Sequence, residues 1–383
     1  MAMKKTNLLN IMGWRGINHS YALVNQFQLL ALRNYTNVKL RHTDMPYAGQ
    51  SWSVASNNSG LKSIDIDWLM SIPHVEDFEE CDWQYQIYSP VEYRPKRSKE
   101  KSLVFLVTEL GVDPNDHRIA PLISAANNDE IIVATPSHWS KTCLEIAGFK
   151  AESIAIIPHA ASPNYFYPLA PIENEKNRKH LGIVDTDIVI LNISSPFWNK
   201  GNDIMLSAFA QALDANPHLL LIIKDQKNLY NIDGREAIIK NLSNQNVNLN
   251  AVMNRIKFIE NNLDLQQLRA LYNISDWYIS SYRAEGFNLP VCESMACGTP
   301  VIVTDGGATD DFLCTKSGMK IMSRPSKRLD TNGRLILFRE PDIKNLVEIL
   351  ETLERKTSVP ALNSIFKSWD YAARSIVKIF TER

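Results

Sequence analysis

The chain has 383 residues, enough for two or three domains, and its 45% hydrophobic and 22% charged residues are ordinary for a globular protein. Its formal net charge of −1 argues against general nucleic-acid binding, so we expect no nucleic-acid partner. The longest apolar runs are shorter than a bilayer-spanning helix.

The apolar run Leu8–Met12 is too short for a secretory signal and is interrupted by Asn10, so we interpret it as a buried strand. The 5 cysteines are an odd number without CxxC spacing. This usage favours reduced thiols and a cytoplasmic location. Cys292 and Cys297 are interpreted as small core residues.

The N-terminal part predicts a strand, a glycine turn and a helix. Asn7–Gly13 is the strand, Gly13–Ser20 the turn, and the helix runs from Tyr21 to about Arg33. This order is typical of one half of a Rossmann domain. The turn lacks the GxGxxG pattern, so a nicotinamide cofactor is not expected.

Further strands follow at Lys101–Val107 and Glu130–Thr135, and polar residues gather where a buried strand ends. Thr108 and Glu109 stand at the end of the first of these strands, where open α/β sheets place functional groups. Ser137 is predicted to cap the next helix.

The proline-rich and charged stretch Pro168–Arg178 is predicted to link two domains. After it, Asp187–Ile193 is a strand that leads into a turn containing Lys200. Lys224 follows the strand Leu219–Ile223. Further elements are predicted as a strand and turn at Arg255–Asn262, a helix at Leu263–Ser275 and an amphipathic helix at Phe366–Phe380.

The most informative stretch is Ser281–Pro300, a loop and one short helix between the strands Asp276–Ser280 and Val301–Thr304. Pro290 fits the first helical turn and Gly298 the C-terminal stop. The backbone N–H groups of roughly residues 286 to 291 are then expected to be free, which makes a binding site for a diphosphate.

Two carboxylates, Glu285 and Glu293, flank this expected anion site. An ionised carboxylate accepts hydrogen bonds from a vicinal diol, so a pair around a diphosphate suits a nucleotide sugar. The alternative is that Glu293 only complements the helix dipole and Glu285 is a solvated loop charge.

The string EGFNLPVCESMACGTPVI, with a Glu, seven residues and a second Glu, resembles the signature of retaining glycosyltransferases of family 4. TPSHWSKTCLEIAGF and IAIIPHAASPNYFYPL also resemble the closing segments of that family's first domain. The resemblance implies an α/β fold of GT-B type, with two Rossmann-like domains facing each other across a cleft. The implied domains are residues 1–170, with a C-terminal helix at 364–383 that packs on them, and residues 171–363.

The resemblance implies that Glu285 contacts hydroxyls of the donor sugar and that Glu293 contacts the ribose diol. Lys200 matches the cation that neutralises the leaving diphosphate, but Ser194 and Ser195 stand where the family usually has Arg. Lys224 is our candidate for the missing charge. The remaining donor-binding candidates are Gly16, Ile259, Gly286, Phe287, Asn288 and Leu289.

Three further candidates lie in the first domain. Arg15 and His19 are expected on the acceptor side, and the equally open alternative is a surface Arg and a capping His. Glu109 stands near the point where family members often carry His, and is a candidate acceptor contact or base. Its alternative is an N-cap or a salt-bridge partner.

We therefore expect retaining, metal-independent transfer of a hexose from a nucleoside-diphosphate sugar to a saccharide, lipid-linked or protein-linked acceptor. Surface polysaccharide or glycoconjugate synthesis is the expected setting. The Asp65-Ile66-Asp67 sequence lies outside the place of a metal-binding DxD motif, so neither a metal nor a cofactor is expected. The alternatives are a sugar-nucleotide epimerase and a non-catalytic nucleotide-sugar-binding protein.

A basic cluster at Arg94–Lys101 suggests contact with the inner face of a membrane, with a solvated loop as the alternative. The sequence gives no prediction of the oligomeric state.

Overall fold

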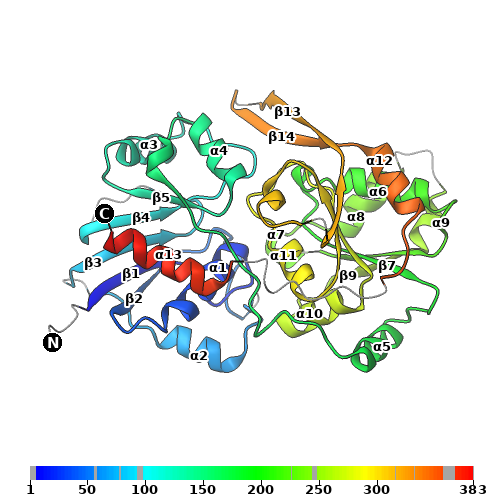
Figure 1. Cartoon of the computed structure of the whole chain (residues 1–383), viewed down its shortest axis with the longest axis horizontal. Coiled ribbons are helices and arrows are strands. Elements are labelled where there is room, and N and C mark those ends of the chain that lie inside the picture. The colour runs from blue at the N-terminus through cyan, green and yellow to red at the C-terminus, as the bar shows by residue number, and fades with distance from the viewer. Residues whose placement is uncertain are drawn as a thin grey trace. The chain divides into compact units, whose positions relative to one another are not determined.

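The computed structural model describes residues 6–382 except 56–57, 77–78, 93–97, 226, 244–247, 315, 332 and 357–366. The chain forms two compact units (Figure 1). The first comprises Met1–Ala160, Leu329–Ile336 and Lys367–Arg383, and the second Ala161–Arg328 and Leu337–Phe366. The sequence instead predicts a division after residue 170.

The first unit is built on a parallel six-stranded sheet with the order β2-β1-β3-β4-β5-β6. Its strands are β1 (Asn7–Gly13), β2 (Val38–Asp44), β3 (Cys81–Ile87), β4 (Ser98–Phe105), β5 (Ile132–Thr135) and β6 (Ile154–Ile156). Its helices are α1 (Ser20–Leu32), α2 (Ser63–Ser71), α3 (Ile119–Asn127), α4 (His138–Ile146) and the C-terminal α13 (Trp369–Thr381). The order reverses between β1 and β3, and the turn after β1 lies at this reversal.

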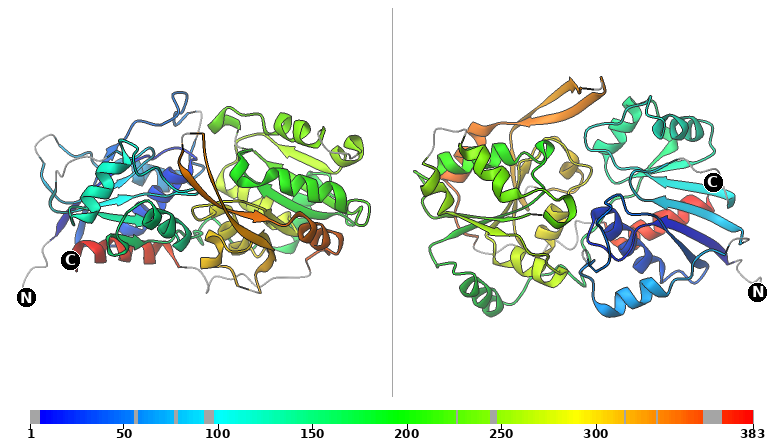
Figure 2. Two further views of the ribbon diagram at one scale, coloured as in Figure 1. Left: turned by 90° about the horizontal axis from the view of Figure 1, so that it is seen from above. Right: turned by 180° about the vertical axis from the view of Figure 1, so that it is seen from behind.

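The helix α13 packs beside α1 in the first unit (Figure 2). Trp369 stacks on Phe27 with ring centroids 5.3 Å apart, and Phe380 stacks on Trp83 at 5.0 Å. These rings place the amphipathic face predicted at the C-terminus against the first unit. Residues 364–366 and 383 of the predicted segment 364–383 lie outside the described residues.

The second unit is built on a parallel sheet with the order β12-β11-β10-β7-β8-β9. Its strands are β7 (Ile188–Ile193), β8 (Leu219–Lys224), β9 (Ile256–Ile259), β10 (Trp277–Ser280), β11 (Val301–Thr304) and β12 (Gly318–Ile321). Counted from β7, this is the Rossmann order, and it reverses between β7 and β10. Ligands of such sheets bind beyond the carboxyl ends of the strands at the reversal.

Helices of the second unit surround this sheet (Figure 1). They are α5 (Pro171–His180), α6 (Asn202–Ala212), α7 (Lys227–Tyr230), α8 (Gly234–Ser243), α9 (Leu249–Met253), α10 (Leu265–Ile274), α11 (Leu289–Ala296) and α12 (Ile343–Glu351). A separate hairpin pairs β13 (Ser323–Leu329) with β14 (Leu335–Pro341). The strands β7 and β8 are fully buried and apolar except for Asn192 and Lys224 near their carboxyl ends, as expected for inner parallel strands.

Most predicted elements are confirmed within one or two residues, including the strand Asn7–Gly13 and the cap of α4, where Ser137 Oγ accepts the N–H of Ser140 at 3.1 Å. The prediction of a linker at Pro168–Arg178 is wrong in part, because α5 covers Pro171–His180. Pro171 occupies the first helical turn, where proline is well tolerated, and three basic residues in the last turn complement the dipole.

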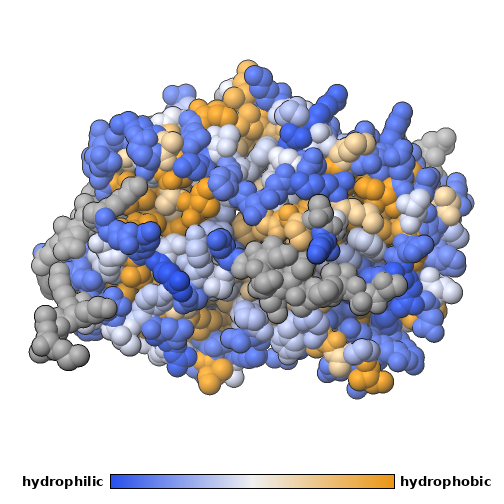
Figure 3. All heavy atoms as spheres, viewed as in Figure 1, coloured by the Kyte–Doolittle hydropathy of each residue, from blue (hydrophilic) through white to orange (hydrophobic). Residues whose placement is uncertain are grey.

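Hydrophobic and hydrophilic side chains are interspersed on the face drawn in Figure 3. Among the described residues, no helix is both long and apolar enough to cross a bilayer. The basic residues Arg94–Arg97, on which the prediction of membrane contact rests, lie outside the described residues.

Candidate nucleotide-sugar site

The candidate residues of the second unit meet at the reversal of its sheet. The turn after β7 carries Lys200, and the loop after β10 carries Glu285. The two strands are parallel neighbours, so their carboxyl ends open at the same edge. Local sequence alone does not give this proximity, because 84 residues separate the two side chains; the strand order does.

The Lys200 turn is held against the Glu285 loop by the backbone. The carbonyl of Asn199 accepts the N–H groups of Arg283 at 2.7 Å and Ala284 at 3.2 Å. Gly201 has φ +68°, and a Cβ there would lie 1.9 Å from the Ser281 carbonyl oxygen. Only glycine allows this approach without moving backbone.

Lys200 and Glu285 form an ion pair, with Nζ 2.9 Å from Oε1. Their side chains are 16% and 11% exposed, so the pair is largely shielded but reachable. A cation beside a carboxylate at a sheet's carboxyl edge can stabilise developing phosphate charge while the carboxylate accepts hydroxyl groups.

Arg283 fastens the same loop and was not among the sequence candidates. Its guanidinium makes two 2.7 Å hydrogen bonds to the carboxylate of Asp203 and lies 4.7 Å from the centre of the Trp198 ring. Its Nε also donates to Glu340 at 3.3 Å. Because two carboxylates already neutralise it, Arg283 holds the Lys200 turn in place and does not replace the missing phosphate cation.

The start of α11 follows directly. Asn288, its N-cap, has φ +75°, a conformation that asparagine tolerates better than most residues, and its Nδ2 donates to Ser280 Oγ at 2.9 Å. Pro290 occupies the first turn and Gly298 follows the end of the helix with φ +74°, as predicted. The expectation of free N–H groups through residue 291 is wrong at its end, because the Val291 N–H donates to the Asn288 carbonyl and Pro290 has no N–H.

Glu293 lies on α11 and is buried. Its Oε2 accepts the hydroxyl of Tyr272 at 2.7 Å. Burial raises the pKa of Glu293 to about 7, and the Tyr272 hydrogen bond opposes this rise. Tyr272 on α10 was missed by the sequence analysis, since a tyrosine at a core position of a helix gives no signal of its polar contact.

Tyr278 on β10 links the surroundings of the two glutamates. Its pKa is raised well above the usual value, first by burial and then by the negative charges of Glu285 and Glu293. Its hydroxyl donates to the Ile193 carbonyl, the last residue of β7, at 3.2 Å. Both acids therefore act on one buried ring at the reversal of the sheet.

Lys224 ends β8 beside Ile193, the residue that precedes Ser194. It is buried, its ammonium donates to the Asp225 carbonyl, and burial lowers its pKa. The Ser194 hydroxyl lies within hydrogen-bond distance of Asn192 Oδ1, at 2.8 Å, and of Asn202 Oδ1, at 2.9 Å, so the position where the family usually has Arg here contacts both sides of the turn.

The other donor candidates of the second unit lie nearby. Gly286 and Phe287 are buried in the loop before Asn288, and Phe287 stacks on Phe312 with centroids 4.7 Å apart. Leu289 begins α11, and Ile259 ends β9, half-buried. Cys292 and Cys297 are buried free thiols, as predicted.

In the first unit, His19 caps its helix, as its alternative predicts, whereas Arg15 is buried and is not the surface Arg of its alternative. The guanidinium of Arg15 bonds Asp44 twice, at 2.8 and 3.0 Å, and also the carbonyl of Leu69; its side chain is 2% exposed. His19 caps α1 by accepting the Tyr21 N–H at 3.2 Å, and burial lowers its pKa to about 4. Most of the Arg15 donors are therefore engaged by protein acceptors.

Gly16 lies in the same turn with φ +86°, and its N–H donates to Gln26 Oε1 at 2.8 Å. Glu109 follows β4 and is half-buried, and its carbonyl accepts the Trp139 indole N–H at 2.8 Å. Its carboxylate charge contributes to a pKa of about 12 at Tyr21, where burial is the main cause. Glu109 therefore lies near the turn that carries Gly16 and His19.

Among the residues the structure describes, no group of three or more His, Cys, Asp or Glu side chains could hold a metal ion. Asp65 and Asp67 both lie on α2, in the first unit.

The two parallel sheets with their helices define the GT-B class of fold. HepE of Anabaena, in complex with UDP and glucose, has the same fold at a TM-score of 0.61 and 17% identity, covering 97% of this chain and 95% of that one. Residues 173–330 match the model of the family "Glycosyl transferases group 1". This stretch contains Lys200, Glu285 and Glu293.

Two relatives match over much of the chain. Mannosylfructose-phosphate synthase of Agrobacterium fabrum is 27% identical over 261 residues, which cover 63% of this chain and 56% of the relative. D-inositol 3-phosphate glycosyltransferase of Corynebacterium jeikeium is 26% identical over 274 residues, covering 70% and 61%. The matches therefore span less than two thirds of either relative.

Proposed function

We propose that the chain transfers a hexose from a nucleoside-diphosphate sugar to an acceptor hydroxyl, with retention of the anomeric configuration and without a metal ion. The observation that carries the proposal is the grouping of the Lys200–Glu285 pair, the start of α11 and the buried Glu293 at one sheet reversal. The names of the two relatives, a synthase and a glycosyltransferase, support it.

In this proposal each part of the donor is bound by a different one of these groups. Glu293 accepts the ribose diol, since two O–H donors favour its ionised form over the neutral form that burial favours. Glu285 accepts hydroxyls of the hexose. The diphosphate lies between them, near the start of α11 and the ammonium of Lys200.

The chemical step breaks the bond between the anomeric carbon and the diphosphate oxygen, and the acceptor oxygen bonds to the same face of that carbon. The acceptor proton passes to the departing diphosphate. Lys200 stabilises the charge that grows on this group, and Lys224 adds positive charge at the neighbouring strand end. The acceptor we propose is a saccharide, lipid-linked or protein-linked hydroxyl in surface polysaccharide or glycoconjugate synthesis.

Epimerisation of the sugar nucleotide is the alternative chemistry. It needs acid and base carboxylates at the sugar, and Glu109 alone does not meet that need. The relatives' names favour transfer.

The test begins with thermal stabilisation of the full chain by a panel of nucleoside diphosphates, including UDP, because a ligand of the folded state raises the unfolding temperature. The stabilising donor is then incubated with candidate acceptors, with and without EDTA. We expect a product whose anomeric configuration, read by NMR, matches the donor, and whose yield is unchanged by EDTA. No stabilisation by any diphosphate would rule out the donor site; an inverted product or an EDTA-sensitive one would correct the mechanism.

A further inference from the structure

A cavity lies at the amino-terminal edge of the same sheet, opposite the candidate nucleotide-sugar site. Its volume is about 420 Å³, within the range of small-molecule sites. It is lined by α5, by the segments that precede β7, β10 and β11, and by the stretch after α12. All of these belong to the second unit. Nothing in the proposed sugar transfer uses this cavity.

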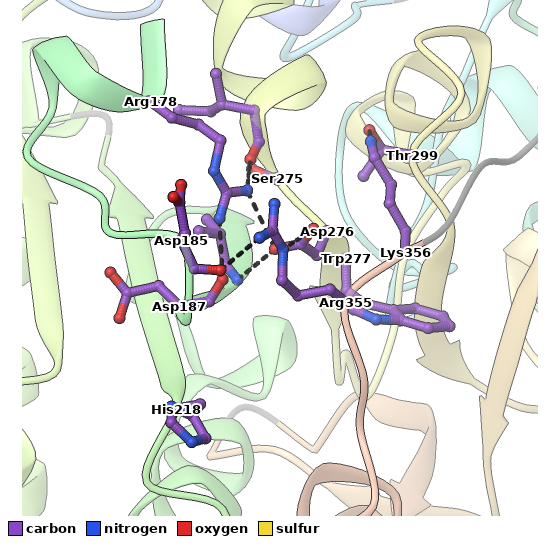
Figure 4. A network of polar contacts seen from close by, with 12 residues as sticks. Arg178, Asp185, Asp187, His218, Ser275, Asp276, Trp277, Thr299, Arg355 and Lys356 are labelled. Atoms are coloured by element: carbon purple, nitrogen blue, oxygen red, sulfur yellow. Dashed lines mark hydrogen bonds and ion pairs between the residues drawn. The ribbon is translucent and has the colours of Figure 1, made fainter. Parts of the chain in front are cut away.

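Four basic side chains line it, and Figure 4 shows three of them, Arg178, Arg355 and Lys356. Arg178 and Lys179 come from α5, and Arg355 and Lys356 from the stretch after α12. The carboxylates in the lining are Glu175, Asp185 and Asp276. Cations thus outnumber carboxylates by four to three.

Three of the cations have negative or carbonyl partners. Arg178 donates to the Ile274 carbonyl at 2.8 Å and to Asp276 Oδ2 at 3.2 Å. Arg355 lies 3.7 Å from the other oxygen of Asp276 and donates to the Asp185 carbonyl. Lys179 pairs with Glu175 at 2.6 Å. Asp276 is therefore shared by two guanidiniums and is itself buried.

Lys356 differs from the other three. Its Nζ donates to the hydroxyl of Thr299 at 2.9 Å, and within the described part of the chain this neutral group is its hydrogen-bond partner. Burial is the largest influence and lowers its pKa to about 8; Asp276 and Cys297 oppose this, and Arg178 adds to it. The ammonium thus stands in a cavity that lacks one negative charge.

We propose that this cavity binds a small phosphomonoester, with the ammonium of Lys356 as its main ligand and the guanidiniums of Arg178 and Arg355 at its rim. The negative charge of a phosphate offsets the one excess positive charge, and guanidinium and ammonium groups are its usual partners in proteins. The volume leaves room for a small organic group attached to the phosphate.

A chain of hydrogen bonds would connect the ligand to the proposed donor site. Lys356 contacts Thr299, the Thr299 hydroxyl donates to the Tyr272 carbonyl at 2.6 Å, and the Tyr272 hydroxyl holds Glu293 at 2.7 Å. The binding proposal itself does not depend on donor binding or on activity.

The first test is amine acetylation of the full chain at pH 8, followed residue by residue with mass spectrometry. Inorganic phosphate and glycerol phosphate are each compared with sodium chloride at equal ionic strength. We expect both phosphates to slow acetylation of Lys356 about fivefold or more, with glycerol phosphate at least as effective, and to leave the exposed Lys344 unchanged. Equal rates at Lys356 in phosphate and chloride would overturn the site; protection by inorganic phosphate alone would overturn the phosphomonoester.

The second test is calorimetric titration of glycerol phosphate into Lys356→Gln and the matched surface variant Lys344→Gln. The proposal predicts about tenfold weaker binding for the first variant and unchanged binding for the second. Equal affinities in the two variants contradict it. Both readouts concern Lys356 itself, so a failure of the proposed transferase function leaves them interpretable.

Discussion

The turns after the first strands of the two units occupy the same place in two similar sheets, but their cations differ in exposure and in partner. In the first unit, Arg15 is 2% exposed and is held by Asp44 and main-chain carbonyls. In the second, Lys200 is 16% exposed and pairs with Glu285, which lies on the loop after the strand across the sheet reversal. A cation at this position can serve a ligand only where its partner also belongs to the site.

The glycines of the two turns also differ in what surrounds them. Gly16 and Gly201 both have positive φ, of +86° and +68°. A Cβ on Gly16 would meet a methyl group of Val54 at 2.8 Å, whereas on Gly201 it would meet the Ser281 carbonyl oxygen at 1.9 Å. The first neighbour is a side chain that can rotate, and the second is backbone that cannot move without displacing the Glu285 loop.

The largest effect is expected from Lys200→Ala. We predict a loss of about 10³-fold in kcat/KM, roughly 4 kcal/mol of transition-state stabilisation, because the leaving diphosphate loses a preorganised cation. The unfolding temperature should change little. Steady-state kinetics and thermal unfolding of the same preparation measure both; an active variant would remove Lys200 from the chemistry.

Arg15→Ala is expected to lower stability and to leave donor binding unchanged, whereas Lys200→Ala affects turnover. Removing the guanidinium takes two hydrogen bonds from the half-buried Asp44 and one from the Leu69 carbonyl, and we predict a loss of about 3 kcal/mol in the free energy of unfolding. Donor affinity should remain that of the wild type. Chemical denaturation and a donor titration decide the matter, and a stable variant with impaired acceptor use would return Arg15 to the acceptor site.

Gly201→Ala and Gly16→Ala form a matched pair of backbone changes. Both pay the strain of positive φ, about 1 kcal/mol, but Gly201→Ala must also shift the Ser281 backbone. We expect the Gly201 variant to lose turnover and the Gly16 variant to lose only stability. If both variants turn over donor equally well, the close approach of the two loops is unimportant.

Lys224→Ala should reduce donor affinity about tenfold, a smaller effect than that of Lys200→Ala, because its ammonium is buried and already donates to the Asp225 carbonyl. Binding of the nucleoside diphosphate measures this. Unchanged affinity and turnover would exclude Lys224 from the site.

The sequence predicts the strands well because buried parallel strands are mainly apolar, as in β7 and β8. It also predicts the position of the loop that carries Glu285 and the two ends of α11. It could not predict that Arg283 is neutralised by Asp203 and Glu340, or that Tyr272 holds Glu293, since these contacts join residues 21 to 80 positions apart. Strand order decides such contacts.

Likewise, no local sequence pattern distinguishes Arg15 from Lys200. Each follows a strand and stands beside a glycine, and only the partner separates them: Asp44 ends β2, while Glu285 follows β10. The sequence does not predict the helix α5, because proline and charged residues are also typical of a linker. Proline nevertheless suits a first helical turn.

A further expected effect concerns the pH dependence of donor binding. Glu293 has a pKa of about 7, and ribose hydroxyls favour its ionised form, so donor affinity should be full above pH 7. Below that, affinity should fall by up to about tenfold per pH unit until the pKa of the bound state is reached. Glu293→Gln should bind weakly and without this slope, measured with an intact nucleotide sugar.

The central claim is tested most directly by calorimetric titration of one nucleoside diphosphate and its sugar into wild type, Glu285→Gln and Glu293→Gln. Both substitutions keep the side-chain shape. The account predicts that Glu293→Gln weakens binding of both ligands, and that Glu285→Gln leaves the diphosphate unaffected while removing the added affinity of the sugar. Wild-type affinities for both ligands in both variants would contradict it.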